Sequence, residues 1–191
     1  MGQGAPLFPD VGKQIRRLAR RDWPLMRDHL LRLDAESRYH RFGVAVNDAF
    51  LEKYAAQSFD ADDLVFAFCV DGRAVGVGEL RGFDRAGVLA EAAFSVEAEW
   101  RGRGVGAALL MRIVETACDL GVEGVYLTCL PQNRAMQSIA RKFAAQLKFE
   151  MCADGGRLLA TTRDSLRHCR FRECFDDNGY IARLDFPRLA G

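Results

Sequence analysis

The chain has 191 residues and a formal net charge of +1, with 49% hydrophobic and 28% charged residues. This length and composition are typical of a single globular domain. The near-neutral charge excludes a protein that coats nucleic acid or a membrane surface through a basic face. No apolar run approaches the roughly 20 residues of a membrane span. Because the six cysteines form no C-x-x-C pair and no signal peptide is visible, we expect a reduced, soluble, cytoplasmic protein.

The N-terminal region predicts an arm, one strand and two helices. Glycines and prolines interrupt residues 1–10, which we expect to form a flexible arm. Hydrophobic spacing then predicts a short strand and two helices at residues 13–19, 22–33 and 47–58. Asp22, with Pro24 in the first turn, is a good capping residue for the first helix. Asn47 or Asp48 caps the second.

Three strands follow, at residues 64–70, 74–81 and 88–96. Asp71-Gly72 between the first two is a strong hairpin signal. Strands joined consecutively by tight turns predict an antiparallel meander.

The pattern then changes to a helix at residues 105–120 and a strand at residues 125–130. A strand, a helix and a further strand predict a right-handed crossover between parallel neighbours. Asn133 caps a helix to about Gln146, and two more strands flank Asp154-Gly155-Gly156. Residues 164–191 are compatible with a helix or a hairpin, of which the helix is favoured. The fold class is therefore α/β (α+β), with a mixed sheet and helices on its faces.

The segment between the third strand and the following helix is rich in glycine: Arg101-Gly102-Arg103-Gly104-Val105-Gly106-Ala107. Glycine permits tight turns and close approach of a ligand to the main chain. The amides that begin the next helix form a site for phosphate or pyrophosphate. The segment lacks the Gly-Lys-Ser/Thr of a P-loop and the G-x-G-x-x-G of a dinucleotide fold. Taken alone, it is also compatible with a glycine-rich turn that binds nothing.

The surrounding residues give this segment a family context. Arg101 to Gly106 match the pattern Arg/Gln-x-x-Gly-x-Gly/Ala, after a strand ending Phe94-Ser95-Val96 and before Asn133. Over residues 88–145 the chain resembles the acetyl-CoA-binding core of the GNAT N-acetyltransferase superfamily. Three further segments are similar to the acetyltransferase domain of bacterial protein lysine acetyltransferases: Arg38-Tyr39-His40-Arg41-Phe42, Ala90-Glu91-Ala92-Ala93-Phe94 and Asn133-Arg134-Ala135-Met136.

The resemblance implies a fold and a cofactor. It implies a GNAT-like, mostly antiparallel sheet of about six to seven strands, splayed between the fourth and fifth. The catalytic domain would span residues 11–163, with residues 164–191 as an extension packed on it. Acetyl-CoA or coenzyme A would pair with the backbone of Phe94 and Val96. Its pyrophosphate would rest on the glycine-rich segment: Arg101, Gly102, Arg103, Gly104, Val105, Gly106 and Ala107. Asn133 would cap a helix and contact the ligand.

Glu91 is the candidate general base. Strand alternation puts Glu91, Ala93 and Ser95 on one face, and a positioned carboxylate can accept the proton of an attacking amine. In the lysine acetyltransferases that this chain resembles, a glutamate in the matching Ala-Glu-x-x-Phe context has this role. A solvent-facing or salt-bridged Glu91 is the alternative. Glu79 is the second candidate, whereas Glu97 and Glu99 have the sequence context of loop residues.

Ala140 stands where many GNAT enzymes carry a tyrosine that protonates the departing thiolate, so the sequence names no general acid. Two functions follow: an acetyl-CoA-dependent N-acetyltransferase that uses direct attack, or a non-catalytic acyl-CoA sensor. The acceptor would be a primary amine of a protein lysine or a small molecule. The resemblance puts Arg38, Tyr39, Arg41 and Phe42 at the acceptor pocket, and these residues are equally compatible with a packed helix end. The three histidines do not cluster, so no metal is expected, and a homodimer remains open.

Overall fold

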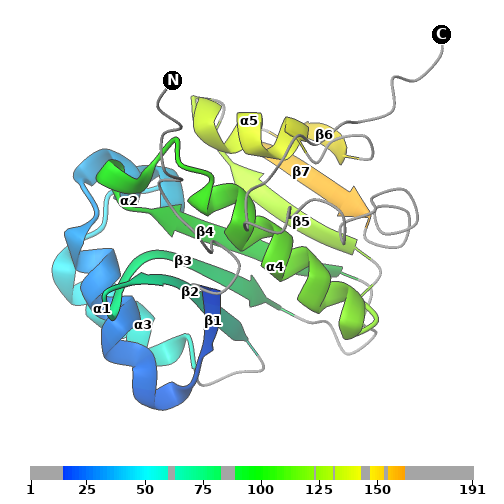
Figure 1. The fold of residues 1–191 in the computed structure, drawn as a ribbon. Coiled ribbons are helices and arrows are strands. Elements are labelled where there is room, and N and C mark those ends of the chain that lie inside the picture. Colours follow the sequence, from blue (N-terminus) through cyan, green and yellow to red (C-terminus); the bar gives the residue numbers. More distant parts are fainter. Residues whose placement is uncertain are drawn as a thin grey trace, which may run out of the picture.

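The computed structural model describes residues 15–59, 63–82, 89–122, 124–130, 132–142, 147–152 and 155–161 (Figure 1). The arm predicted at residues 1–10 and the extension predicted at residues 164–191 lie outside the described residues. Among the described residues, no helix is long and apolar enough to cross a membrane.

Within the described residues, seven strands form one mixed sheet in the order β1-β2-β3-β4-β5-β7-β6. The strands are β1 (Ile15–Leu18), β2 (Leu64–Val70), β3 (Arg73–Arg81), β4 (Leu89–Val96), β5 (Gly124–Cys129), β6 (Leu147–Cys152) and β7 (Gly155–Thr161). The β4–β5 pair is parallel, and the other neighbouring pairs are antiparallel. Asp71 and Gly72, with φ of 49° and 77°, form the predicted hairpin turn between β2 and β3. The expected mixed sheet, meander and crossover are therefore confirmed.

The helices are α1 (Trp23–Arg32), α2 (Ala35–Phe42), α3 (Asp48–Gln57), α4 (Val105–Asp119) and α5 (Arg134–Lys142), with short 3₁₀ turns η1 (Arg20–Asp22) and η2 (Ala98–Trp100). The prediction of two N-terminal helices was wrong, because α2 is a separate helix. The Asp34 carboxylate accepts the Ser37 N–H at 2.7 Å and begins α2. Gly43 ends it in the left-handed conformation. The one buried residue of α2 is the polar Ser37, so this helix has no repeating hydrophobic face. Hydrophobic spacing therefore did not predict it.

The two predicted caps act differently. Asn47 caps α3 as expected, since its side-chain oxygen accepts the Phe50 N–H at 2.9 Å. Asp22 is at the N-cap position of α1 but makes no side-chain capping bond there. Its carboxylate instead accepts the Ala19 N–H at 2.9 Å and a hydrogen bond from Arg16. Asp22 therefore holds the preceding turn rather than the helix end.

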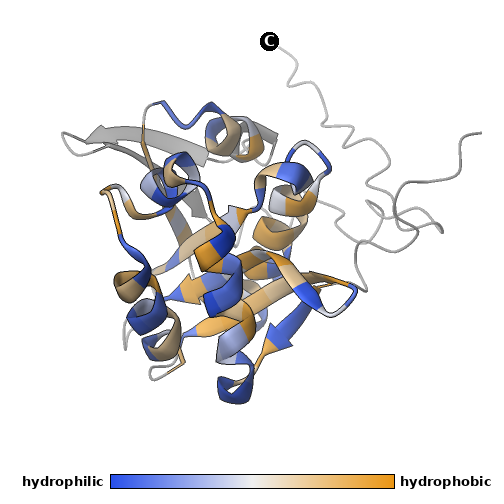
Figure 2. Cartoon of the chain, turned by 90° about the vertical axis from the view of Figure 1, so that its left-hand side faces the viewer, coloured by the Kyte–Doolittle hydropathy of each residue, from blue (hydrophilic) through white to orange (hydrophobic). Residues whose placement is uncertain are grey.

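The sheet carries a separate hydrophobic core on each face. One core packs α4 residues such as Leu109 and Ile113 against the sheet, and the other packs α1 and α3 against the opposite face (Figure 1). Figure 2 shows that these helices carry both hydrophobic and hydrophilic residues, as helices on a sheet must. On the α4 face, a Cβ added at Gly76 would lie 2.9 Å from a Val105 methyl carbon. The strand glycine therefore allows the first turn of α4 to lie directly on β3.

The sheet opens between β4 and β5. The two strands pair only where Leu89, Ala90 and Glu91 face Gly124, Val125 and Tyr126. Both then continue, to Val96 and Cys129, without pairing with each other. This confirms the predicted splay between the fourth and fifth strands.

The ladder with β3 decides which groups of β4 face the splay. The Glu97 N–H donates to the Val75 carbonyl at 3.0 Å, and the β3–β4 register is regular. In an antiparallel ladder, alternate residues direct both main-chain groups to the same neighbour. Ala93 and Ser95 therefore face β3, whereas the N–H and C=O groups of Phe94 and Val96 face the splay.

Candidate active site

The glycines of the segment between β4 and α4 have two distinct structural roles. Gly102 and Gly104 adopt φ of 71° and 85°, a region that side chains other than glycine rarely enter. Gly106 lies inside α4, where an added Cβ would be 2.9 Å from Ile139 and 3.3 Å from the Phe94 ring. The first two glycines permit the turn, and the third allows Ile139 of α5 and the Phe94 ring to pack closely against α4.

The turn leads into an uncapped helix N-terminus. Gly104 is the N-cap residue of α4 and has no side chain to cap it. The first backbone bond of the helix runs from the Ala108 N–H to the Gly104 carbonyl, at 2.9 Å. The N–H groups of residues 105–107 therefore have no acceptor within the helix. Together with the helix dipole they form a site suited to an anion.

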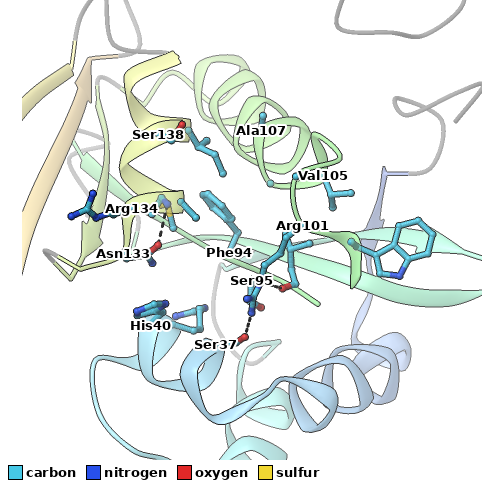
Figure 3. Close-up of a pocket in the computed structure, with 18 of the residues that line it drawn as sticks. Ser37, His40, Phe94, Ser95, Arg101, Val105, Ala107, Asn133, Arg134 and Ser138 are labelled. Carbon is cyan, nitrogen blue, oxygen red and sulfur yellow. Dashed lines mark hydrogen bonds between the residues drawn. The ribbon is translucent and has the colours of Figure 1, made fainter. Parts of the chain in front are cut away.

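A cavity of about 500 Å³ opens at this helix end. Figure 3 shows its walls, with α4 and α5 on one side, α2 on the other, and Phe94 and Ser95 of β4 between them. Its lining includes most residues predicted to hold the cofactor: Phe94, Val96, Arg101, Gly102, Gly104, Val105, Gly106, Ala107 and Asn133. Arg103 is the predicted residue that does not line it.

The two arginines of the glycine-rich segment differ in position. The Arg101 guanidinium contacts Asp34 at 3.3 Å, hydrogen-bonds Ser37 and reaches the Val96 carbonyl at 3.4 Å. It therefore bridges the glycine-rich segment to the start of α2 (Figure 3). The Arg103 guanidinium lies over the Trp100 ring, 5.2 Å from its centroid. Arg101 is thus the nearer of the two to a ligand in the cavity.

Asn133 has the predicted capping role. Its side-chain oxygen accepts the Met136 N–H at 3.0 Å at the start of α5 (Figure 3). The residue is 8% exposed and lines the cavity. No hydrogen bond joins its side-chain NH₂ to another described residue, so this donor is available to a ligand.

A second cavity, of about 410 Å³, adjoins the first. Residues of α2, α3, β3 and the splayed strands line it, including Phe42, Tyr54, Arg81, Glu91 and Cys129. Four residues line both cavities: His40, Arg41, Phe94 and Met136. Of the predicted acceptor residues, Arg41 and Phe42 line this cavity, whereas Arg38 and Tyr39 do not. Arg38 instead pairs with Asp48 at 2.7 Å and binds main-chain carbonyls.

The two candidate carboxylates have different surroundings. Glu79 is 1% exposed, and its carboxylate accepts hydrogen bonds from Arg41 at 2.5 Å and from the Tyr54 hydroxyl at 2.8 Å. Burial and the Glu79 charge raise the pKa of Tyr54 above its usual 10.0. Burial alone would lower the pKa of Arg41, but Glu79 and Tyr54 outweigh it and raise that pKa. Glu79 therefore has a structural role in this network, as a fixed counter-ion.

Glu91 is half-buried and lines the second cavity. No hydrogen bond or ion pair joins it to another described residue, so the salt-bridged alternative is absent within that part of the chain. Arg41 has Glu79 as its counter-ion and Arg81 pairs with Asp63 at 3.0 Å. Among the described charged side chains that line the second cavity, Glu91 is therefore the one without an oppositely charged partner.

Sequence reasoning missed the burial of Glu97. This residue follows β4 directly and is 4% exposed, because Arg32, Arg73 and His29 surround its carboxylate. Burial opposes its ionisation, but hydrogen bonds from His29, Arg32 and Arg73 lower the pKa of Glu97 to about 2. An acidic residue directly after a strand carries no sequence signal of partners that lie on α1 and β3. Across the described residues, no group of three His, Cys, Asp or Glu side chains is arranged to hold a metal ion.

Comparison with protein families identifies this architecture. The model of the acetyltransferase (GNAT) family matches residues 14–145. The chain belongs to the GNAT acetyltransferase family. The match covers the splayed strands, the glycine-rich turn and Asn133, which are the features that the sequence motifs predicted. The expected resemblance is therefore confirmed.

Solved structures show the same fold at low sequence identity. The GNAT domain of S. lividans PAT is 22% identical with a TM-score of 0.63, over 76% of this chain and 87% of that one. AAC(6′)-Ib in complex with paromomycin and acetyl-CoA is 15% identical, with a TM-score of 0.62 and coverage of 82% and 97%. The PaiA N-acetyltransferase from Thermoplasma acidophilum, in complex with coenzyme A, is 16% identical, with a TM-score of 0.56 and coverage of 77% and 97%.

Proposed function

We propose that this GNAT acetyltransferase moves an acetyl group from acetyl-CoA to a primary amine by direct attack, with Glu91 as general base. The observation that carries the proposal is the junction of the two cavities at β4. The first cavity ends at the uncapped N-terminus of α4, and the second contains the Glu91 carboxylate. We retain residues 11–163 as the catalytic domain, which the family match to residues 14–145 supports.

The lining of the first cavity fits coenzyme A. The helix N-terminus and Arg101 supply positive potential for a diphosphate, and Gly106 lines the cavity beside them without a side chain. The main-chain groups of Phe94 and Val96 face the splay and can pair with an amide-bearing chain as an added strand does. The Asn133 side chain adds a donor. Two of the structures with this fold contain coenzyme A or acetyl-CoA.

Acetyl-CoA, when bound, supplies an acetyl group activated as a thioester. The residues of the chain orient this group and receive the amine in the second cavity. Glu91 accepts the proton that the amine nitrogen loses as it bonds to the carbonyl carbon. The carbon–sulfur bond then breaks, and the sulfur leaves as the thiolate of free coenzyme A. A carboxylate without a fixed partner can accept this proton, whereas the Glu79 carboxylate is already hydrogen-bonded to Arg41 and Tyr54.

The Glu91 carboxylate should be required for turnover. Glu91→Gln keeps the size of the side chain but cannot accept the proton, so we expect the kcat for amine acetylation to fall by about 100-fold or more. The affinity for coenzyme A, measured by titration calorimetry, should stay nearly unchanged because Glu91 lines the second cavity only. Steady-state kinetics with a panel of amines and lysine peptides checks the effect.

Glu52→Gln is the matched control, since Glu52 is an exposed carboxylate on α3 that lines neither cavity. Equal kcat values for wild type and Glu91→Gln would reject the assigned base. Absence of coenzyme A binding at micromolar concentrations would reject the cofactor. Tight binding without turnover on any amine would favour the acyl-CoA sensor instead.

A further inference from the structure

Three polar side chains that amine acetylation does not use are joined beside the first cavity. The Ser95 hydroxyl lies 2.9 Å from His29 Nε2, and His29 Nδ1 lies 3.4 Å from Glu97 Oε1. The serine comes from β4, the histidine from α1, and the carboxylate from the residue after β4. Within the described residues these side chains form one continuous series of contacts, from a hydroxyl through an imidazole to a carboxylate. We call it the Ser95–His29–Glu97 arrangement.

The charges of Glu97 and His29 determine where the protons of this arrangement lie. Glu97 is held as a carboxylate, which accepts hydrogen bonds and donates none. Burial lowers the pKa of His29 below its usual 6.5, so the imidazole is neutral near pH 7. His29 Nδ1 therefore carries the ring proton toward Glu97, and Nε2 accepts the Ser95 proton. A neutral imidazole in this state is placed to take that proton from the hydroxyl.

Of the three side chains, Ser95 is the one that a ligand can reach. His29 is 0% exposed and Glu97 is 4% exposed, whereas Ser95 is 9% exposed and lines the first cavity (Figure 3). The residues on either side, Phe94 and Val96, direct their N–H groups into the splay. Such donors can stabilise the oxygen of an attacked carbonyl. A nucleophile, a base, an orienting carboxylate and main-chain donors thus meet at one wall.

We propose that Ser95 is a nucleophile that accepts an acyl group from a bound thioester when no amine is present, which makes the protein a slow acyl-CoA hydrolase as well. The proposal rests on the proposed function only for the identity of the acyl donor. The Ser95–His29–Glu97 arrangement itself is independent of it.

The reaction proceeds in two balanced steps. The Ser95 oxygen bonds to the acyl carbonyl carbon while its proton passes to His29 Nε2. The carbon–sulfur bond then breaks, and the sulfur leaves with the proton from His29, which gives free coenzyme A and an ester on Ser95. Water next attacks that ester with His29 again as base, and the bond to the Ser95 oxygen breaks. The products are a carboxylic acid and the original serine.

The surroundings of His29 explain why this reaction is slow. Burial opposes protonation of His29, as does the Arg32 guanidinium, whereas Glu97 and a hydrogen bond to the Ala74 backbone favour it. Glu97 is also shared with Arg32 and Arg73, so only part of its charge is available to the imidazole. The amine route, which uses Glu91 in the other cavity, avoids this cost.

The test uses p-nitrophenyl acetate, a small activated ester that does not depend on the coenzyme A site for recognition. The full chain is allowed to react with the ester and is quenched in acid during turnover. We expect mass spectrometry of its peptides to find one acetyl group, on Ser95. Ser95→Ala should release p-nitrophenolate at least about tenfold more slowly than wild type. Thr116→Ala is the matched control, because it also removes a hydroxyl group, and Thr116 lies on α4, donates to the Arg112 carbonyl and lines neither cavity. This variant should react like wild type.

If wild-type protein releases p-nitrophenolate but carries no acetyl group on Ser95 when it is quenched in acid during turnover, the proposal is overturned, whatever the stability of the Ser95→Ala variant. Equal release by wild type and a folded Ser95→Ala variant would also overturn it. Coenzyme A should protect Ser95, since both occupy one cavity. If calorimetry shows no coenzyme A binding, the proposed function fails. Acetylation of Ser95 by the ester still decides whether the Ser95–His29–Glu97 arrangement activates the serine.

Discussion

At the scale of single residues, the surroundings of a carboxylate decide its function. Glu79, Glu91 and Glu97 all lie in or beside neighbouring strands. Glu79 and Glu97 are buried and are held by arginines. Glu91 is half-buried, faces a cavity and has no hydrogen-bonding partner among the described residues. Identical side chains therefore act as counter-ions at two positions and, in our proposal, as a base at the third.

Glu97 makes stability depend on acidity. Its pKa is about 2 in the folded protein and 4.5 without these partners, so the unfolded chain binds the proton first as the pH falls. Its contribution is therefore complete above pH 4.5 and is lost between about pH 4.5 and pH 2. A shift of this size corresponds to roughly 3 kcal/mol of unfolding free energy.

Urea unfolding of wild type and Glu97→Gln at pH 7 and pH 3 tests this linkage. Wild type should be more stable by a few kcal/mol at pH 7, and the gap should narrow at pH 3. Glu99→Gln is the control, because Glu99 also contacts Arg73 but is 62% exposed and should change stability little. A gap that is the same at both pH values would contradict the role of the Glu97 charge.

At the scale of elements, β4 combines two functions because its residues alternate. Ala93 and Ser95 bond the strand to β3, and Phe94 and Val96 present main-chain groups to the splay. A strand that pairs fully on one edge is rigid enough to hold those groups in place for a ligand on the other.

Amide hydrogen exchange can detect this alternation. Addition of coenzyme A should slow the exchange of the Phe94 and Val96 amides, because they gain acceptors. The Ala93 and Ser95 amides should change little, since they already donate to β3. NMR of the protein with and without coenzyme A measures all four sites in one experiment. Equal protection of all four amides would show a general stiffening instead of strand-like pairing.

At the scale of the whole molecule, Arg101 connects the two faces of the sheet. It belongs to the turn that leads to α4 on one face, and it contacts Asp34 and Ser37 at the start of α2 on the other. The helix α2 also carries His40 and Arg41, which line both cavities. The contact therefore joins the proposed cofactor site to the wall of the proposed acceptor site.

Asp34→Asn separates this contact from helix capping, because asparagine caps as well as aspartate. We expect stability to change by less than about 1 kcal/mol, as for other exposed ion pairs. Coenzyme A should bind up to about fivefold more tightly, since Arg101 and its surroundings become more attractive to phosphate. Calorimetry measures the affinity. Asp48→Asn, which removes the exposed partner of Arg38, is the charge-matched control, and an equal gain there would contradict a local effect of Arg101.

Sequence patterns alone predict the strand order of the meander, the crossover through α4, the glycine-rich turn and the cap at Asn133. These features depend on local chemistry: hydrophobic period, left-handed glycines and capping side chains. Contacts between packed elements establish that Glu79 is neutralised by Arg41 and that His29 touches both Ser95 and Glu97. Those contacts join residues far apart in the chain, so no short segment contains both partners. Burial and charge pairing, which set the chemistry of each carboxylate, arise only when the elements pack.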